Sequence, residues 1–92
     1  MNAPVDYMTL PLEKFTIRDL TDAIGIAESA RVLDTSTRAI YTQRNTRRIS
    51  VDRMQKLVAH LRTNERHYRE RLAIKRDMQA RAAATVQVLA QA

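Results

Sequence analysis

The sequence predicts an all-α fold, and two observations favour that class. The 92 residues include one glycine and two prolines, and both prolines lie before residue 12. A compact β-protein needs more turn residues than that. From Thr16 onward, apolar residues recur at the three- and four-residue spacing of amphipathic helices. A chain of this length forms one domain with a modest core, so we expect association with a second copy to add stability.

The first helix is predicted from its two ends. Residues 1–15 carry both prolines and show no sustained period, so we expect an arm that packs partly on the domain. Thr16 followed by Asp19 forms the pattern of a capping box, in which each residue bonds the backbone of the other. The helix then runs from Ile17 and ends at Gly25.

A polar run separates two short helices, expected at about residues 27–33 and 36–43. It contains Asp34, Thr35 and Ser36, whose short side chains hydrogen-bond their own backbone and therefore favour a turn. Asp34 tolerates left-handed dihedral angles better than most residues do, and Thr35 or Ser36 can cap the following helix. The pattern is typical of a helix-turn-helix unit.

The second helix of this unit has a polar outer face if Ile40 points into the core. The outward side chains, in which we include Arg44, form hydrogen bonds, and none of them is acidic. A helix that enters the phosphate-lined groove of DNA needs such a face. We expect base contacts from Ser36, Thr37, Arg38, Tyr41 and Thr42. The alternative for Tyr41 is a ring laid across the neighbouring helix.

The net charge of +6 is unevenly distributed along the chain. Up to Thr37 there are three basic and six acidic residues, whereas from Arg38 to the end there are thirteen basic and four acidic ones. The positive charge thus begins at the predicted DNA-binding helix, which points to a polyanionic partner. The simpler alternative is a basic surface that only aids solubility. The arginines expected to contact phosphates are Arg31, Arg44, Arg47 and Arg48.

Residues 17–40, IRDLTDAIGIAESARVLDTSTRAI, resemble without a gap the opening of phage Cro proteins. They are similar, less closely, to lambdoid repressors and all-helical phage activators. The matching positions are the Arg18-Asp19 pair, Ile24, Gly25, Ala30, Leu33 and the Ala39-Ile40 pair. The turn position that glycine usually occupies holds Asp34. The resemblance covers about a quarter of the chain and implies a lambda-repressor-like, four-helix domain that binds DNA.

Two further helices are predicted after this unit. Ser50 caps the first of them, whose apolar stripe closes the core. That stripe consists of Val51, Met54, Leu57, Val58 and Leu61. A second helical stretch runs from about Asn64 to Leu89, either after a break at Thr63-Asn64 or continuous with the first.

The second stretch has a thin apolar stripe that predicts a dimerising helix. The expected dimerisation residues are Tyr68, Leu72, Met78, Val86 and Leu89. A solvated charged helix with a frayed end is the alternative. We therefore divide the chain into an arm (1–15), a helix-turn-helix domain (16–62) and a C-terminal oligomerisation helix (63–92).

Enzymatic functions are disfavoured by the residue content. The single glycine excludes a glycine-rich phosphate loop, and no nucleophile and base stand out as a pair, so we expect no catalytic residues and no cofactor. His60 and His67, with Glu70 one turn further on, match no closed zinc pattern, so we expect no metal. The chain lacks cysteine and any apolar run of membrane-spanning length, and its first fifteen residues lack the basic-then-apolar order of a signal peptide. We expect a protein of the bacterial cytoplasm that does not bind membranes.

These observations predict a sequence-specific regulator of transcription, a phage- or prophage-type repressor that binds double-stranded operator DNA as a homodimer. A protein-interaction module of the antitoxin or anti-activator type, with a basic helix that binds an acidic protein, is the main alternative. Non-specific packaging of nucleic acid is the third. Salt-dependent binding to a specific duplex, compared with a scrambled duplex, discriminates among them.

Overall fold

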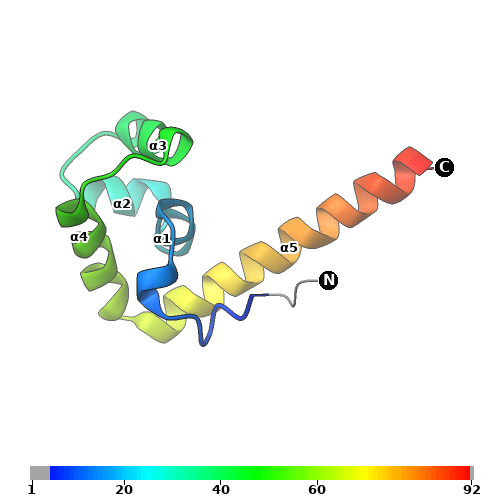
Figure 1. The fold of residues 1–92 in the computed structure, drawn as a ribbon, viewed down its shortest axis with the longest axis horizontal. Helices are drawn as coiled ribbons and strands as arrows, with labels where there is room; N and C mark the ends of the chain where they lie inside the picture. The colour runs from blue at the N-terminus through cyan, green and yellow to red at the C-terminus, as the bar shows by residue number, and fades with distance from the viewer. Residues whose placement is uncertain (1–4, 92) are drawn as a thin grey trace.

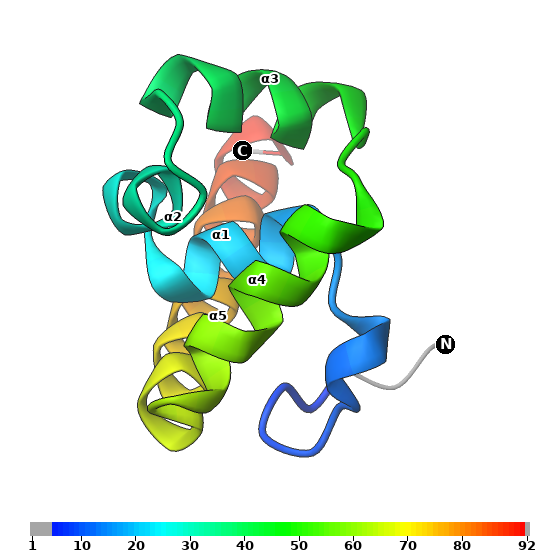
Figure 2. The ribbon, with the colours of Figure 1, turned by 90° about the vertical axis from the view of Figure 1, so that its left-hand side faces the viewer.

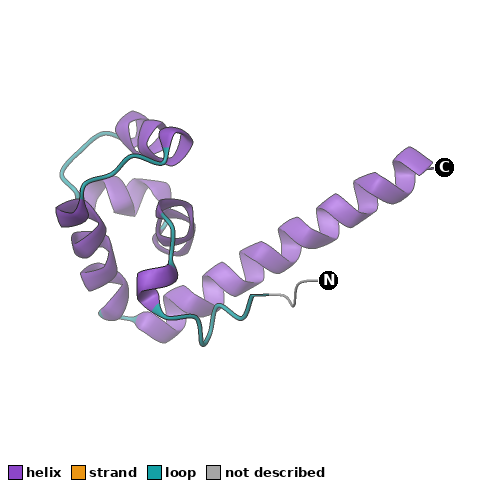
Figure 3. Cartoon of the chain, viewed as in Figure 1, coloured by secondary structure: helices purple, strands orange, loops and turns teal. Residues whose placement is uncertain are grey.

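The computed structural model describes residues 5–91, and within that range the chain is helical without any strand (Figure 3). This confirms the prediction of an all-α fold. Five α-helices follow a short 3-10 turn, and the fifth is far longer than the others. The elements are η1 (Leu12–Lys14), α1 (Ile17–Ile24), α2 (Ile26–Val32), α3 (Thr37–Thr46), α4 (Val51–Arg62) and α5 (Glu65–Gln91). None of these helices has the length and hydropathy needed to cross a membrane.

Helix α1 lies at the centre of the fold and contacts each of the other four α-helices (Figures 1 and 2). Its sequence sets both of its ends. The Thr16 hydroxyl accepts a hydrogen bond from the Asp19 amide, and the Asp19 carboxylate accepts one from the Thr16 amide, which confirms the predicted capping box. Gly25 ends the helix at φ +101°, a conformation that only glycine adopts without strain. Leu20 and Ala23 are fully buried between these ends.

Helix α4 packs against α1, α2 and α5. The Ser50 hydroxyl accepts a hydrogen bond from the Arg53 amide and caps the helix, as predicted. Leu57 and Leu61 of the predicted stripe are fully buried, whereas Val51 at its start is 72% exposed. The helix ends at Arg62, and α5 begins at Glu65, so the chain breaks at Thr63-Asn64 rather than continuing as one helix.

The arm packs against the first half of α5. Leu12 and Phe15 are buried in the core, and the Arg69 guanidinium lies over the Phe15 ring at 5.1 Å. The same guanidinium donates hydrogen bonds of 2.7 Å to the carbonyls of Tyr7 and Leu10. The predicted packing of the arm is therefore observed for residues 5–15, and residues 1–4 lie outside the described range. The packed body of the molecule extends past residue 62 into α5.

Two of the expected dimerisation residues are used within the chain, which corrects their assignment. Leu72 is fully buried in the core, and Tyr68 packs against that core. The spacing of the stripe did not indicate which face of α5 lies on the domain. Met78, Val86 and Leu89 are 64%, 66% and 70% exposed, on the half of α5 that runs away from the other helices (Figure 1).

Candidate nucleic-acid interface

The turn between α2 and α3 is closed by backbone hydrogen bonds and one left-handed residue. The Thr35 amide donates to the Ala30 carbonyl at 2.9 Å, and the Asp34 amide donates to the Arg31 carbonyl at 3.2 Å. These two bonds define a Schellman motif, whose C′ position adopts left-handed dihedrals. Asp34 occupies that position at φ +51°, as its tolerance of this conformation predicted. Aspartate thus replaces the usual glycine while the geometry of the turn is kept.

Helix α3 begins at the end of this turn and is fixed by one cap and one apolar contact. The Ser36 hydroxyl accepts a hydrogen bond from the Ala39 amide at 3.1 Å, so Ser36, and not Thr35, is the N-cap. Ile40 is fully buried, as predicted, and α3 packs on both α1 and α2. In both ribbon views α3 lies along the upper edge of the bundle (Figures 1 and 2).

The opposite side of α3 forms an exposed polar face. Arg38 and Thr42 are exposed there, and Tyr41 is 53% exposed, so its ring does not lie across a neighbouring helix. Thr37 in the first turn is also exposed, although it lies about 60° from Ile40 on the helical wheel. The Thr42 hydroxyl donates to the Arg38 carbonyl and keeps its lone pairs free to accept. At 100° per residue, Asn45 falls in the middle of this face, and it is exposed. Asn45 was not among the predicted contacts, although its position three residues after Thr42 and four after Tyr41 places it on the same face.

Arg44 points inward, which corrects the expectation that it faces outward and contacts phosphate. Its Nη1 atom donates to Thr21 Oγ1 at 2.6 Å and to Asp22 Oδ1 at 2.8 Å, and the side chain is only 16% exposed. Angular position alone explains the change, because Arg44 lies about 40° from the buried Ile40 on the helical wheel. A long side chain at such a boundary turns toward a nearby carboxylate. Arg44 is therefore part of the core packing of α3 on α1.

Arg31 of α2 was also expected to contact phosphate, but it pairs with a carboxylate of its own helix. Its guanidinium forms an ion pair with Glu28, and its side chain is 70% exposed. The bond from Arg31 lowers the pKa of Glu28 below its ordinary value, with a further contribution from the charges of Arg31 and His60. Arg31 therefore reaches any anionic ligand only in competition with Glu28.

Two shallow hollows meet at Ile49, just beyond the end of α3. Arg18 and Arg47 line one of them, and Arg47, Arg48 and Arg53 line the other. Arg47 and Arg48 were predicted from the sequence as phosphate contacts, whereas Arg18 and Arg53 were not. Those two come from α1 and α4, so only the tertiary fold brings them to this place.

None of these four arginines, nor Arg38, forms an ion pair with another described residue. We refer to Arg18, Arg38, Arg47, Arg48 and Arg53 as the unpaired arginines. Arg62 of α4 and Arg71 of α5 also form no ion pair among the described residues, but neither lies on α3 or lines these hollows. Arg38 lies on the exposed face of α3, and the other four unpaired arginines line the hollows beyond the C-terminal end of that helix. No carboxylate in the described part of the chain pairs with them. Such a surface favours a polyanion.

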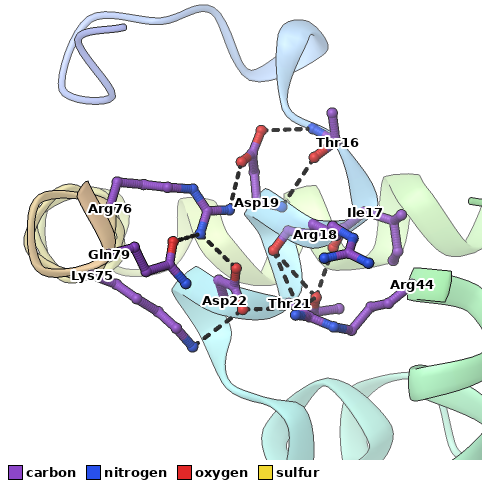
Figure 4. Close-up of polar contacts among 10 residues, drawn as sticks. All are labelled: Thr16, Ile17, Arg18, Asp19, Thr21, Asp22, Arg44, Lys75, Arg76 and Gln79. Atoms are coloured by element: carbon purple, nitrogen blue, oxygen red, sulfur yellow. Dashed lines mark hydrogen bonds and ion pairs between the residues drawn. The ribbon is translucent and has the colours of Figure 1, made fainter. Parts of the chain in front are cut away.

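A buried acidic cluster on α1 lies between α3 and α5 (Figure 4). Asp22, whose side chain is 4% exposed, bonds Arg44 of α3 through Oδ1 and Arg76 of α5 through Oδ2, the latter at 2.7 Å. Lys75 lies 3.2 Å from Oδ1, and Arg76 also bonds Asp19 at 2.9 Å. Burial by itself raises the pKa of Asp22, but the bonds from Arg76, Arg44 and Lys75 outweigh it and lower the pKa below its ordinary value.

This cluster was not predicted from the sequence, because its partners lie far apart along the chain. The carboxylates of Asp19 and Asp22, three residues apart on one helix, were the only local signal. They predict a shared acidic face but not the helix that meets it.

The two histidines lie beside one tyrosine rather than together at a metal site. The ring centroids of His60 and His67 are 5.8 and 5.4 Å from that of Tyr68. His60 Nε2 also lies 3.4 Å from Glu28 Oε1. Within the described residues, no group of three or more His, Cys, Asp or Glu side chains is placed to hold a metal ion.

Comparison of the chain with protein-family models, with curated proteins and with solved structures gave no match. The likeness to Cro proteins therefore rests on the residues of α1 to α3 themselves. What the structure adds is a small all-α domain of five helices.

Proposed function

We propose that this chain is a sequence-specific double-stranded DNA-binding protein that regulates transcription, of the phage or prophage repressor type. One observation carries the proposal: α3 presents an exposed polar face without acidic residues, and the unpaired arginines lie on that face and around Ile49 beyond its end. The Schellman turn and the buried Ile40 hold that face in a fixed orientation relative to α2. A rigid helix of this kind fits the major groove.

The exposed residues divide into two roles. Thr37 and Arg38 lie in the first turn of α3, the part that penetrates the groove most deeply, and an arginine there reaches the paired acceptors of a guanine. Tyr41, Thr42 and Asn45 follow on the same face, within reach of further base edges or of a thymine methyl group. The arginines around Ile49 contact phosphates, which supplies affinity and register but no sequence preference.

A homodimer formed through the second half of α5 completes the proposal. Repressors with a single small reading helix gain affinity by binding two half-sites at once. Ile74, Met78 and Leu89 are 61%, 64% and 70% exposed, and they lie on the side of α5 away from the buried Leu72. Met78 and Leu89 were already expected from the sequence, so Ile74 alone takes the place of Tyr68 and Leu72 among the expected contacts between copies. Val86, which was also expected, is 66% exposed.

Selection from a pool of random duplexes, followed by fluorescence anisotropy, tests the proposal. The wild-type chain should enrich one sequence and bind it at least about a thousandfold more tightly than a scrambled duplex. Arg38→Ala should weaken binding to the selected duplex by about ten- to a hundredfold and leave the scrambled duplex nearly unaffected. Arg38→Lys should restore binding to the selected duplex only in part, because lysine cannot form the two parallel hydrogen bonds of a guanidinium.

Arg66→Ala is the matched control, since Arg66 is 87% exposed at the start of α5, away from α3 (Figure 1). It removes the same charge and should leave the preference unchanged. Equal binding to all duplexes would instead support non-specific packaging. Enrichment of no duplex at all would contradict the proposal and favour the protein-interaction alternative, an antitoxin or anti-activator type with an acidic protein partner.

A further inference from the structure

The Asp22 carboxylate joins two helices that have different tasks in the proposed function. One of its oxygens accepts from Arg44 of α3 at 2.8 Å, and the other accepts from Arg76 of α5 at 2.7 Å. Figure 4 shows the two guanidinium groups approaching Asp22 from opposite sides, with α1 between them. A single side chain therefore holds the DNA-binding helix and the C-terminal helix in one arrangement.

This cluster is also where α5 leaves the body of the molecule. Arg76 is 23% exposed and bonds both Asp19 and Asp22, whereas every residue from Asp77 to Ala90 is exposed. The Arg76 guanidinium also lies 5.9 Å from the Tyr7 ring of the arm. The direction in which α5 projects is consequently set at this point rather than further along the helix.

The bonding pattern needs a carboxylate and not merely a polar group. Each oxygen of Asp22 faces a different cation, and Lys75 shares Oδ1 with Arg44. An asparagine has one acceptor oxygen, so its NH2 group would face either Arg44 or Arg76 and break one of the two connections. The helix whose arginine loses its bond to Asp22 would keep the other bonds of that arginine to α1, from Arg44 to Thr21 and the Arg18 carbonyl or from Arg76 to Asp19.

We propose that Asp22 is a positioning residue that fixes the orientation of α3 relative to α5. In a dimer joined through α5, it thereby sets the separation of the two α3 helices and the spacing of the DNA half-sites that the dimer accepts. The second statement rests on the proposed function, whereas the first concerns this chain alone. Dimeric helix-turn-helix proteins accept half-sites whose separation matches that of their recognition helices.

A distance measurement between spin labels tests the first statement. The chain has no cysteine, so Thr46→Cys on α3 and Gln87→Cys on α5, both exposed, give two unique labelling sites. Labelled protein is diluted with unlabelled protein so that only distances within one chain are measured by pulsed electron resonance. We expect one narrow distance distribution, which Asp22→Asn broadens or splits.

Asp77→Asn is the matched control, because Asp77 is 59% exposed and pairs only with Arg81 of its own helix. It should leave the distribution narrow. If circular dichroism shows that Asp22→Asn does not fold, the same distance is measured in Arg76→Gln, which leaves Asp22 with Arg44 and Lys75. This variant should also broaden or split the distance distribution. A folded variant with the wild-type distribution would overturn the proposal.

The half-site spacing is measured separately, by selection from duplexes in which two copies of the preferred half-site stand at different separations. Wild type should enrich one separation, and Asp22→Asn should accept several with the same base preference. A residue that only stabilises the fold would lower binding at all separations alike.

If wild type enriches no duplex, the proposed function fails, and the spin-label distances still decide whether Asp22 positions α3. If wild type enriches one separation and Asp22→Asn enriches the same one, Asp22 does not set the spacing.

Discussion

Two sets of arginines in this molecule lie in contrasting environments. The first set packs inward and bonds carboxylates or carbonyls, with side chains 16%, 9% and 23% exposed. It consists of Arg44, Arg69 and Arg76, which we call the interior arginines. The second set, the unpaired arginines, lies on the exposed face of α3 and around Ile49 beyond its end, and forms no ion pair with another described residue.

The comparison shows that the net charge of a segment does not identify its binding residues. The sequence after Thr37 is strongly basic, but part of that charge balances Asp19 and Asp22 inside the fold and the half-exposed Glu65. Buried charges that are paired in this way hold helices in place. Charges without such partners attract external anions. Five of the arginines that form no ion pair among the described residues lie on α3 or around Ile49, and the other two, Arg62 and Arg71, lie on α4 and α5.

The largest expected difference between the two sets is in stability. Arg44→Ala should lower the free energy of unfolding by about 3 kcal/mol, at the lower end for breaking a buried ion pair, because Asp22 keeps Arg76 and Lys75. Arg48→Ala, which removes the same side chain from an exposed site, should change it by less than about 0.5 kcal/mol. Urea titrations followed by circular dichroism measure both values. Equal effects would remove the basis for separating the two sets.

Acid should selectively weaken the ion pairs that the interior arginines Arg44 and Arg76 form with Asp22. The pKa of Asp22 is lowered in the folded state, so the unfolded state binds its proton more readily. Its contribution to stability is complete above the ordinary aspartate pKa of about 4 and is lost as the pH falls through the lowered folded-state pKa.

Urea titrations between pH 6 and pH 2 measure this dependence. The wild-type chain should lose stability on acidification, and Asp22→Asn should lose less over the same range. Asp77→Asn, which removes a solvent-exposed carboxylate, serves as the control and should follow the wild type. If Asp22→Asn instead has the wild-type pH dependence, the ionised Asp22 does not hold the cluster together.

Local signals in the sequence predicted the helices, while the inward arginines needed the tertiary fold. The capping box at Thr16, the helix end at Gly25 and the cap at Ser50 depend on neighbours within four residues, and all three predictions are confirmed. The left-handed turn at Asp34 follows from the same kind of short-range preference. Periodicity likewise indicated the burial of Ile40, Leu57 and Leu61.

Arg44 and Leu72 show why the rest was not predictable. Arg44 bonds a carboxylate 22 residues earlier, and its direction depends on how α3 crosses α1. Leu72 belongs to an apolar stripe whose spacing is equally compatible with the core and with a second copy. The direction of α5 decides between them, and that direction depends on Arg69 and Arg76, whose partners lie 54 or more residues earlier.

The smallest expected effects concern phosphate contacts. Arg48→Ala and Arg53→Ala should each weaken binding to the selected and scrambled duplexes alike. Each should also reduce the slope of log K against log salt by about one unit. Fluorescence anisotropy at several salt concentrations gives these slopes, with Arg66→Ala as the control. Loss confined to the selected duplex would assign the altered arginine to base recognition instead.

Arginine side-chain NMR tests the distinction between the two sets most directly. The Nε–Hε signals of the intact chain are followed during titration with its selected duplex. The account predicts that the signals of Arg38, Arg47, Arg48 and Arg53 shift, while those of Arg44, Arg69 and Arg76 stay in place. Shifts of the interior arginines without any change at Arg38 and Arg48 would contradict it, because DNA would then bind a surface other than α3.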